Sequence, residues 1–345
     1  MLFVTNRVLE QGLTPLPTTG EEFRLARSVN FVLENNQAEQ SFYCCRRTGP
    51  YGYTEIGSAN FFDEIKALKV DQILFFIHGY STLPEQAFEQ AERLQQLLDS
   101  LQLASVRDAV KSPKIAVIPL VWPCDNDFGR VQDYFDDQKA ADASGLAYMR
   151  LMQKFLDWRV ENSTLENPCL KRVNVLAYSM GNRVLRGALS LSAKYYPQSG
   201  LTLLFRNVFM AAADVVNETL ESKQAGGIIP PMSRNVVVYY AADDLALRAS
   251  KVANVGNASA SRRLGHTGPE KMDKVPKNVF AIDCDDFNND YDRLGHTYFL
   301  DDPQSGDAGL LLRHAWACMR TGRVPGTSSA IPESRVEILN GRQSL

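Results

Sequence analysis

The stretch VNVLAYSMGNRVL, residues 173–185, decides the fold predicted for this 345-residue chain. Its first half is an apolar run typical of a buried strand, and its second half has the composition of a helix. Ser179 lies between them, flanked two residues away on each side by the small residues Ala177 and Gly181. A serine at such a tight strand-to-helix turn is presented at the end of the strand, which is the geometry of a nucleophile elbow. The alternative is an ordinary turn in which Ser179 only caps the helix.

Apolar runs of strand length alternate with stretches of helical spacing along the rest of the chain. Strands are predicted at 31–33, 41–45, 73–77, 115–121, 173–178, 203–212, 235–241 and 278–282. Helices are predicted at 84–101, 140–160, 182–195, 245–252 and 309–319. This alternation indicates an α/β fold with a doubly wound, mainly parallel sheet flanked by helices.

The two ends of the chain differ from this middle part. Residues 1–60 read as short strands added to the sheet, and residues 322–345 are rich in Gly, Ser and Pro. We therefore expect one domain over residues 1–321, followed by a loosely packed tail over 322–345.

Composition excludes several classes of protein. The formal net charge is −3 with no basic stripe, which gives no support to nucleic-acid binding. The sequence has neither a secretory signal nor an apolar stretch of about 18 residues, so no membrane span is expected. The cysteines are scattered without C-x-x-C spacing, which argues against a zinc site. We expect a cytoplasmic protein with reduced thiols; its oligomeric state stays open.

A serine nucleophile needs a base, and the chain has four histidines. His296 follows the last predicted strand and precedes the last predicted helix, so it is the favoured base. His266 lies before that strand in a polar stretch and is the rival. His78 directly follows the strand at 73–77, and His314 falls inside a helical pattern, where a structural role is expected.

The acid that orients the base is expected between the serine and the histidine in the chain. Asp243 and Asp244 follow the strand predicted at 235–241. Asp244 is favoured because it starts the Asp-Leu-Ala-Leu run that carries the family resemblance given below; Asp243 is an alternative, expected instead to cap the next helix. Asp214, at the end of the preceding strand, is a second alternative.

Further residues are candidates because of their place beside these motifs. The backbone N–H groups of Tyr80 and Met180 would form an oxyanion hole, since each follows a turn next to a predicted strand. Tyr178, Trp122 and Tyr298 are candidates for substrate contact, with core packing as the alternative for the aromatic residues.

Residues 283–292 carry several acidic side chains and raise the question of a calcium loop. The segment lacks the glycine and the terminal glutamate of an EF-hand. A solvated acidic loop is therefore favoured, and no metal is expected.

At this point the sequence resembles a known family. The segments 78–80 (His-Gly-Tyr), 177–185, 244–247 (Asp-Leu-Ala-Leu) and 295–299 (Gly-His-Thr-Tyr-Phe) resemble a bacterial α/β-hydrolase family whose members are largely uncharacterised and esterase-like. The likeness spans roughly residues 70–320. It departs at Ala177, where the superfamily more often has glycine, and at Tyr178, where this family often has histidine.

The resemblance implies a serine hydrolase and leaves the substrate open, because this fold hosts many chemistries. Our interpretation is an enzyme that cleaves small-molecule carboxylic esters through an acyl-enzyme, without a metal or organic cofactor. Ser179 would attack, His296 would accept its proton and Asp244 would orient His296. The segments 124–137 and 215–232 are short for a large lid, so short or medium acyl chains are expected. The alternatives are an amidase, thioesterase or lipase with the same residues, or a hydrolase-fold protein that only binds a ligand.

Overall fold

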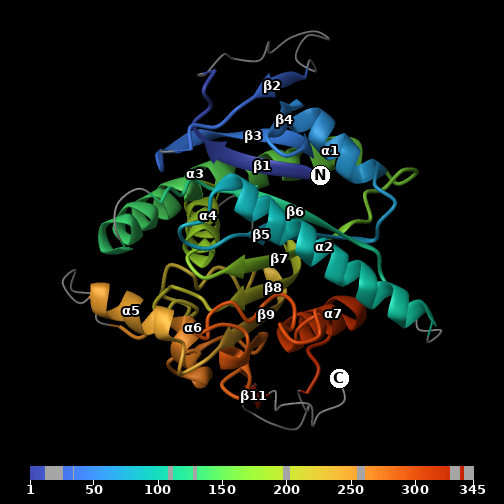
Figure 1. The fold of residues 1–345 in the computed structure, drawn as a ribbon. Coiled ribbons are helices and arrows are strands. Elements are labelled where there is room, and N and C mark those ends of the chain that lie inside the picture. Colours follow the sequence, from blue (N-terminus) through green and yellow to red (C-terminus); the bar gives the residue numbers. More distant parts are fainter. Residues whose placement is uncertain are drawn as a thin grey trace.

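The computed structural model describes residues 1–11, 26–33, 35–107, 112–126, 130–196, 203–254, 261–326 and 335–337. These residues form one 11-stranded sheet with helices packed on both faces (Figure 1). The strand order is β11-β10-β9-β8-β7-β5-β6-β1-β3-β4-β2. The predicted fold class is confirmed.

The bounds of the elements are as follows. The strands are β1 (Leu2–Arg7), β2 (Arg27–Val29), β3 (Ala38–Gly49), β4 (Gly52–Glu55), β5 (Gln72–Ile77), β6 (Ile115–Val121), β7 (Arg172–Tyr178), β8 (Phe205–Ala211), β9 (Ser233–Tyr240), β10 (Val279–Asp283) and β11 (Arg335–Glu337). The helices are α1 (Gly57–Ala67), α2 (Pro84–Arg107), α3 (Arg130–Asn162), α4 (Gly181–Tyr195), α5 (Leu245–Asn254), α6 (Leu264–Thr267) and α7 (Leu310–Thr321), with 3₁₀ turns η4 (Met272–Lys274) and η5 (Asn288–Asp290).

The sheet combines a parallel centre with an antiparallel N-terminal part. All neighbouring pairs from β11 through β6 to β1 are parallel. The pairs β1–β3, β3–β4 and β4–β2 are antiparallel. In a parallel sheet the carboxyl ends of the strands meet at one edge, so the segments after β5, β6, β7, β8 and β9 come together there.

Alternate residues of each central strand pack against different helices, because successive side chains point to opposite faces. In β7, Val173 and Val175 join the apolar cluster that contains residues of α1, α3 and α4. Leu176 joins the cluster that contains residues of α2 and α7. Burial on both faces explains why these strands read as near-continuous apolar runs.

A line of buried amides crosses the sheet on the α7 side. Asn174 donates to Gln72 Oε1 at 3.0 Å, Asn207 donates to Asn174 Oδ1 at 2.7 Å, and Asn235 donates to Asn207 Oδ1 at 2.8 Å. Both ends of this amide ladder donate to the C-terminal end of α7 and the residue after it: Gln72 to Met319 O at 2.9 Å and Asn235 to Gly322 O at 3.3 Å. A register shift of one residue would turn an amide to the other face, so the ladder fixes the pairing.

The structure corrects three local expectations. The strand predicted at 31–33 is wrong: Phe31 forms only an isolated bridge to Leu9, and its ring packs 4.7 Å from that of Tyr53. Its apolar character serves core packing rather than a strand ladder. Helix α1 was not predicted, because the segment to residue 60 read as strands. Helix α3 begins ten residues before the helix predicted at 140–160, and its first turns bury Asp133 and Asp137.

Two expectations keep their standing as predictions. The single-domain boundary at residue 321 is one, and the loosely packed tail is the other, since residues 327–334 and 338–345 lie outside the described residues. In the described part of the chain, no helix combines the length and apolar character needed to cross a bilayer. All six cysteines are buried and unpaired.

Candidate active site

Ser179 occupies a strained turn between β7 and α4. Its φ of 51° lies in the left-handed region, which costs a residue with a Cβ roughly 1–3 kcal/mol. The turn is held by bonds from Ser179 N to Ala211 O at 2.9 Å and from Asp214 N to Ser179 O at 3.1 Å. A Cβ at position 181 would lie 2.5 Å from the carbonyl oxygen of His78, so only glycine fits there. This is the geometry expected of a nucleophile elbow.

Ser179, His296 and Asp244 form a continuous hydrogen-bonded line at the carboxyl edge of the sheet. His296 Nε2 lies 2.9 Å from Ser179 Oγ, and His296 Nδ1 lies 2.7 Å from Asp244 Oδ2. Asp244 is fully buried, so its carboxylate holds the Nδ1–H tautomer and leaves Nε2 to accept from the serine hydroxyl. This arrangement can remove a proton from Ser179.

The three competing carboxylates have different partners. The other oxygen of Asp244 accepts from Leu247 N at 2.9 Å, so Asp244 itself caps α5. The expectation that Asp243 caps this helix is wrong, because Asp243 instead accepts bonds from the side chains of Asn288 and Asn289. The structure brings only Asp244 of the three into contact with His296.

Asp214 belongs to a separate buried network. It pairs with Arg263 at 3.2 Å and accepts from Ser250 Oγ at 2.6 Å and from Tyr134 Oη at 2.8 Å. This network joins α3, α5 and the segment before α6 beside the elbow. The carboxylate of Asp214 therefore binds Arg263, Ser250 and Tyr134 rather than His296.

The loop that carries His296 is held by Asp292, a residue that the sequence analysis did not single out. Asp292 Oδ2 accepts from His296 N at 3.1 Å and from Thr297 N at 2.6 Å. Burial raises its pKa, but the bonds from Thr297, Leu294 and His296 outweigh it and lower the pKa below its usual value. The spacing of four residues between the aspartate and the histidine was the available signal. The segment 283–292, expected to be a solvated loop, thus supports His296.

The loop after β5 lies directly against the elbow. A Cβ at Gly79 would lie 3.2 Å from Ser179 Cβ and 3.0 Å from the Tyr178 ring. The loop is braced by the His78 ring, which stacks on Trp122 with centroids 5.1 Å apart, and by Trp122 Nε1, which donates to His78 O at 2.8 Å. Met180 is the N-cap of α4, and amides at a helix N-terminus have no intrahelical acceptor. The Tyr80 and Met180 amides are thus carried on segments that meet beside Ser179.

The sequence of residues 55–311 matches the family described as alpha/beta hydrolase of unknown function (DUF900). The chain belongs to this family. No curated protein and no solved structure matches it significantly. Family membership agrees with the order of strands in the sheet and with the turn at Ser179, but it does not identify a substrate.

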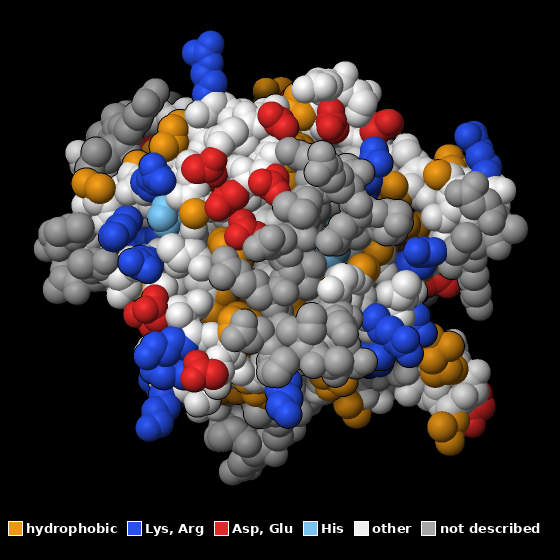
Figure 2. Space-filling model, turned by 90° about the horizontal axis from the view of Figure 1, so that it is seen from below, with side chains coloured by type: hydrophobic (Ala, Val, Ile, Leu, Met, Phe, Trp, Pro, Cys, Tyr) orange, Lys and Arg blue, Asp and Glu red, His pale blue; other side chains and the backbone are white. Residues whose placement is uncertain are grey.

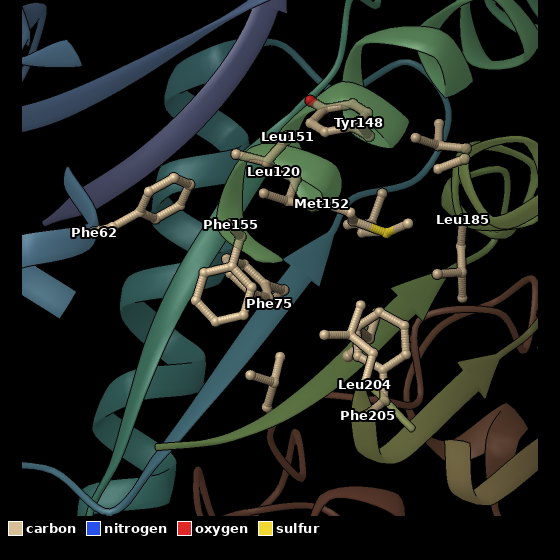
Figure 3. A pocket seen from close by; sticks show the side chains of 15 residues that line it. Phe62, Phe75, Leu120, Tyr148, Leu151, Met152, Phe155, Leu185, Leu204 and Phe205 are labelled. Carbon is tan, nitrogen blue, oxygen red and sulfur yellow. The ribbon is translucent and has the colours of Figure 1, made fainter. Parts of the chain in front are cut away.

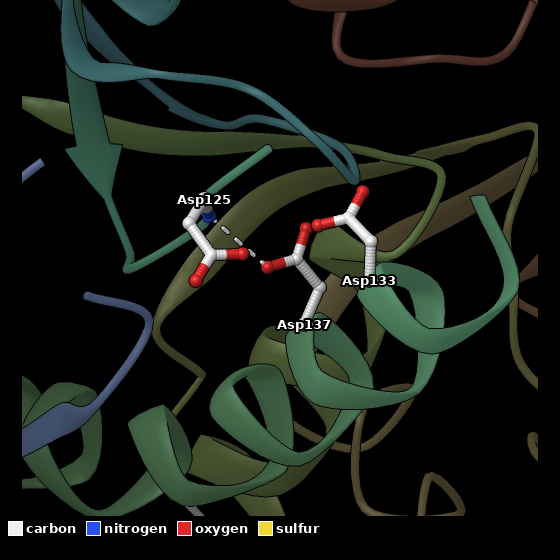
Figure 4. A group of neighbouring side chains, drawn as sticks. All are labelled: Asp125, Asp133 and Asp137. Carbon is white, nitrogen blue, oxygen red and sulfur yellow. Dashed lines mark hydrogen bonds between the residues drawn. The ribbon is translucent and has the colours of Figure 1, made fainter. Parts of the chain in front are cut away.

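Three buried carboxylates meet at the start of α3, next to the loop after β5. The carboxylates of Asp125, Asp133 and Asp137 lie within 4.8 Å of one another, a grouping of the kind that can hold a cation or share a proton (Figure 4). Burial raises the pKa of Asp137 to about 7. The sequence analysis missed this cluster, although the i, i+4 spacing of Asp133 and Asp137 places them on one helix face.

Two of the aromatic candidates for substrate contact are corrected by burial. Trp122 and Tyr298 have no exposed surface, and the Tyr298 hydroxyl donates to Tyr239 O at 3.4 Å. Both support the site from within the core and leave no ring face for a ligand. Tyr178 is also nearly buried, but its ring centroid lies 5.2 Å from that of His296.

The remaining histidines occupy other environments. His314 is buried in α7, 2.8 Å from the Tyr239 hydroxyl, and burial lowers its pKa to about 4. His266 lies in α6 and contacts Arg248 at 3.4 Å. Burial and the charge of Arg248 lower the pKa of His266.

An apolar cavity of about 50 Å³ lies between the sheet and helices α3 and α4. Figure 3 shows side chains from α1, α3, α4 and the strands pointing into it, including Phe62, Phe155 and Leu185. None of Ser179, His296 and Asp244 is among the residues that line this cavity. A larger space of about 590 Å³ lies where β5 and β7 begin, at the opposite edge of the sheet from Ser179.

The face at the β11 end of the sheet shows a mixed charge distribution (Figure 2). Acidic side chains gather in its upper part, and the Lys and Arg side chains lie in separate groups.

Proposed function

We propose that this α/β-hydrolase is a serine esterase that cleaves small carboxylic esters through an acyl-enzyme. The observation that carries the proposal is the hydrogen-bonded line Ser179–His296–Asp244, with distances of 2.9 Å and 2.7 Å. Each of the three residues comes from a different loop at the carboxyl edge of the sheet. Such a convergence serves proton transfer from a hydroxyl, which a binding-only protein does not need.

The reaction proceeds by two transfers of the acyl group. Ser179 Oγ attacks the ester carbonyl carbon while its proton moves to His296 Nε2, and the imidazolium then protonates the departing alcohol. Water attacks the acyl-enzyme by the same route, which returns the proton to Ser179. Asp244 keeps His296 in the tautomer that this cycle needs and stabilises its cation.

The negative charge on the substrate oxygen is bound by the backbone amides of Met180 and Tyr80. The contact between Gly79 and Ser179 supports this role, because it brings the loop after β5 to the nucleophile. Removing one such donor typically costs about 2.7–4 kcal/mol of transition-state stabilisation.

We expect the enzyme to prefer short or medium acyl chains. The segment 215–232 is one of the two that could cover the site, and its apolar residues Leu220, Ile229 and Met232 lie in the core. Its exposed stretch, residues 222–225, has the sequence Ser-Lys-Gln-Ala and offers little apolar surface for a long chain. Hydrolysis of p-nitrophenyl esters from acetate to palmitate checks this expectation. We expect kcat/KM to be highest for acyl chains of about eight carbons or fewer. High activity confined to long-chain emulsions would contradict it.

The panel also separates the related activities. Matched p-nitrophenyl thioesters and anilides of the best acyl group distinguish thioesterase and amidase from esterase. A protein that labels with no fluorophosphonate probe and turns over none of these compounds would be a binding protein, and the proposal would fail.

Asp244→Asn is expected to lower kcat by about 10²–10⁴-fold, because an amide at this position stabilises the wrong imidazole tautomer. Asp243→Asn is the matched control from the adjacent position and should keep near-normal kcat. Asp214→Asn tests the remaining carboxylate, whose partners are Arg263 and Ser250. Steady-state kinetics of the three variants decide the assignment: a dead Asp214→Asn beside an active Asp244→Asn would reverse it.

A further inference from the structure

The turn after β5 is fastened to helix α3 by two carboxylates. Ser81 N donates to Asp137 Oδ2 at 2.8 Å, and the Tyr80 hydroxyl donates to Asp133 Oδ2 at 2.7 Å. Figure 4 shows both aspartates rising from the start of α3 toward this turn. The turn therefore has side-chain anchors on an element that follows it by some fifty residues, as the separation of 53 between Tyr80 and Asp133 shows.

The backbone of this turn is strained and needs such support. Ser81 has a φ of 52°, in the region that disfavours residues with a Cβ. The charge-assisted bond to the Ser81 amide is made only in this conformation, so it favours the strained turn over its relaxed alternatives. The second oxygen of Asp137 accepts from Asp125 N at 3.3 Å, which ties the segment after β6 to the same point.

Movement of this turn would shift the Tyr80 amide relative to Ser179. Gly79 packs closely against Ser179 and Tyr178, since an added Cβ would lie 3.0–3.2 Å from their side chains, and Tyr80 lies between Gly79 and the anchored Ser81. The position of the Tyr80 amide relative to Ser179 is therefore fixed on one side by the Gly79 contact and on the other by the bond between Ser81 and Asp137. A shift of about 1 Å in a group that binds a transition state can cost on the order of 10²-fold in rate.

We propose that Asp137 and Asp133 are positioning residues, which set the Tyr80 amide at the oxyanion by anchoring the Ser81 turn to α3. The proposal rests on the proposed esterase function and extends it to residues that touch neither substrate nor the reacting atoms. Asp137 holds the backbone of the turn, and Asp133 holds the Tyr80 side chain.

The anchor at Asp137 depends on its ionisation. Its carboxylate is faced by the following titratable or charged groups: Asp125, Asp133, Arg7, Cys124 and Tyr80. Burial raises the pKa of Cys124 and Tyr80 above their usual values, and a guanidinium keeps its proton. Burial raises the pKa of Asp137 itself to about 7, so its carboxylate accepts both amides above that pH and carries a proton below it.

The test compares Asp137→Asn with the wild type and with Asp136→Asn. The latter is a matched change at the preceding position of α3, where the carboxylate pairs with Lys139. An amide offers only one acceptor oxygen to the two amides that Asp137 binds. We expect kcat to fall about 10–100-fold at pH 9 with KM within about threefold. Inhibition by a trifluoromethyl ketone, whose adduct with Ser179 carries an oxyanion, should weaken in proportion, and Asp136→Asn should match the wild type.

The pH dependence separates positioning from general damage. Protonated Asp137 resembles asparagine, so the ratio of wild-type to variant kcat should fall toward one as the pH drops below about 7. Any loss through His296 cancels in this ratio because both proteins share that residue. A ratio independent of pH, or a loss confined to KM, would overturn the proposal.

Tyr80→Phe and Asp133→Ala carry the test if Asp137→Asn does not fold. Because they remove the same bond, each should lower kcat, and the double variant should lose no more than either alone. Additive losses would overturn the role of the Tyr80–Asp133 pair. A wild type that hydrolyses no ester overturns the proposed function, whereas an active wild type with an unimpaired Asp137→Asn overturns this inference alone.

Discussion

Ser179→Ala is expected to lower kcat by about 10⁴-fold or more while the protein stays folded, because no other group on the line to His296 can form the acyl-enzyme. The hydroxyl lies 2.9 Å from the base, and the Asp244 carboxylate is already in place behind it. Labelling with a fluorophosphonate followed by peptide mapping provides the direct measurement. The wild type should carry the label on Ser179, and the variant should carry none.

Ser179→Gly is the informative companion to this variant. It also removes the nucleophile, but glycine accepts the φ of 51° without strain. Its free energy of unfolding should therefore exceed that of Ser179→Ala by about 1 kcal/mol, measured by denaturant titration. Label on a different serine in the wild type would refute the assignment of the nucleophile, and equal stability of the two variants would refute the strain.

His296→Ala is expected to abolish nearly all turnover, since Ser179 then has no base for its proton. His266→Ala is the matched control because it removes the same side chain from the rival position. His266 contacts Arg248 and lies outside the line of hydrogen bonds that reaches Ser179, so most activity should remain. Single-turnover rates of the two variants with a p-nitrophenyl ester provide the comparison.

Comparison of the two histidine variants tests whether His296 alone acts as the base. Losses of similar size in the two variants would place a second histidine in the reaction. Recovery of His296→Ala activity by added imidazole would support the role of a general base rather than of a structural contact.

Motifs that depend on neighbouring residues could be found from the sequence. The elbow at 173–185 and the strands at 73–77 and 115–121 are local patterns, and the described elements match them closely. The Ser…Asp…His order follows from the order of strands in this fold, which makes the adjacent pair Asp243 and Asp244, and His296, accessible to prediction.

Features that depend on distant pairing could not be found in this way. Asp137 lies before the helix predicted at 140–160, and nothing near it in the sequence indicates that Ser81, 56 positions earlier, donates to its carboxylate. Likewise Asp243 and Asp244 are adjacent, and only the path of the 283–292 segment decides which of them meets His296. Trp122 and Tyr298 were expected at the ligand because sequence position gives nearness to a motif but not the direction of a side chain.

The amide ladder has a consequence for the order of events during protein synthesis. Ser179, Asp244 and His296 have all been made before Met319 and Gly322, whose carbonyls accept the bonds at the two ends of the ladder. Until those carbonyls arrive, the Gln72 side-chain NH₂ lacks its Met319 acceptor and Asn235 keeps only its bond to Asn207, and a buried N–H without a partner is costly. The nascent chain thus contains Ser179, Asp244 and His296 before the two carbonyl groups that complete the amide ladder have been synthesised. The amide ladder is therefore complete only after α7 and Gly322 have been synthesised and α7 has packed against the sheet.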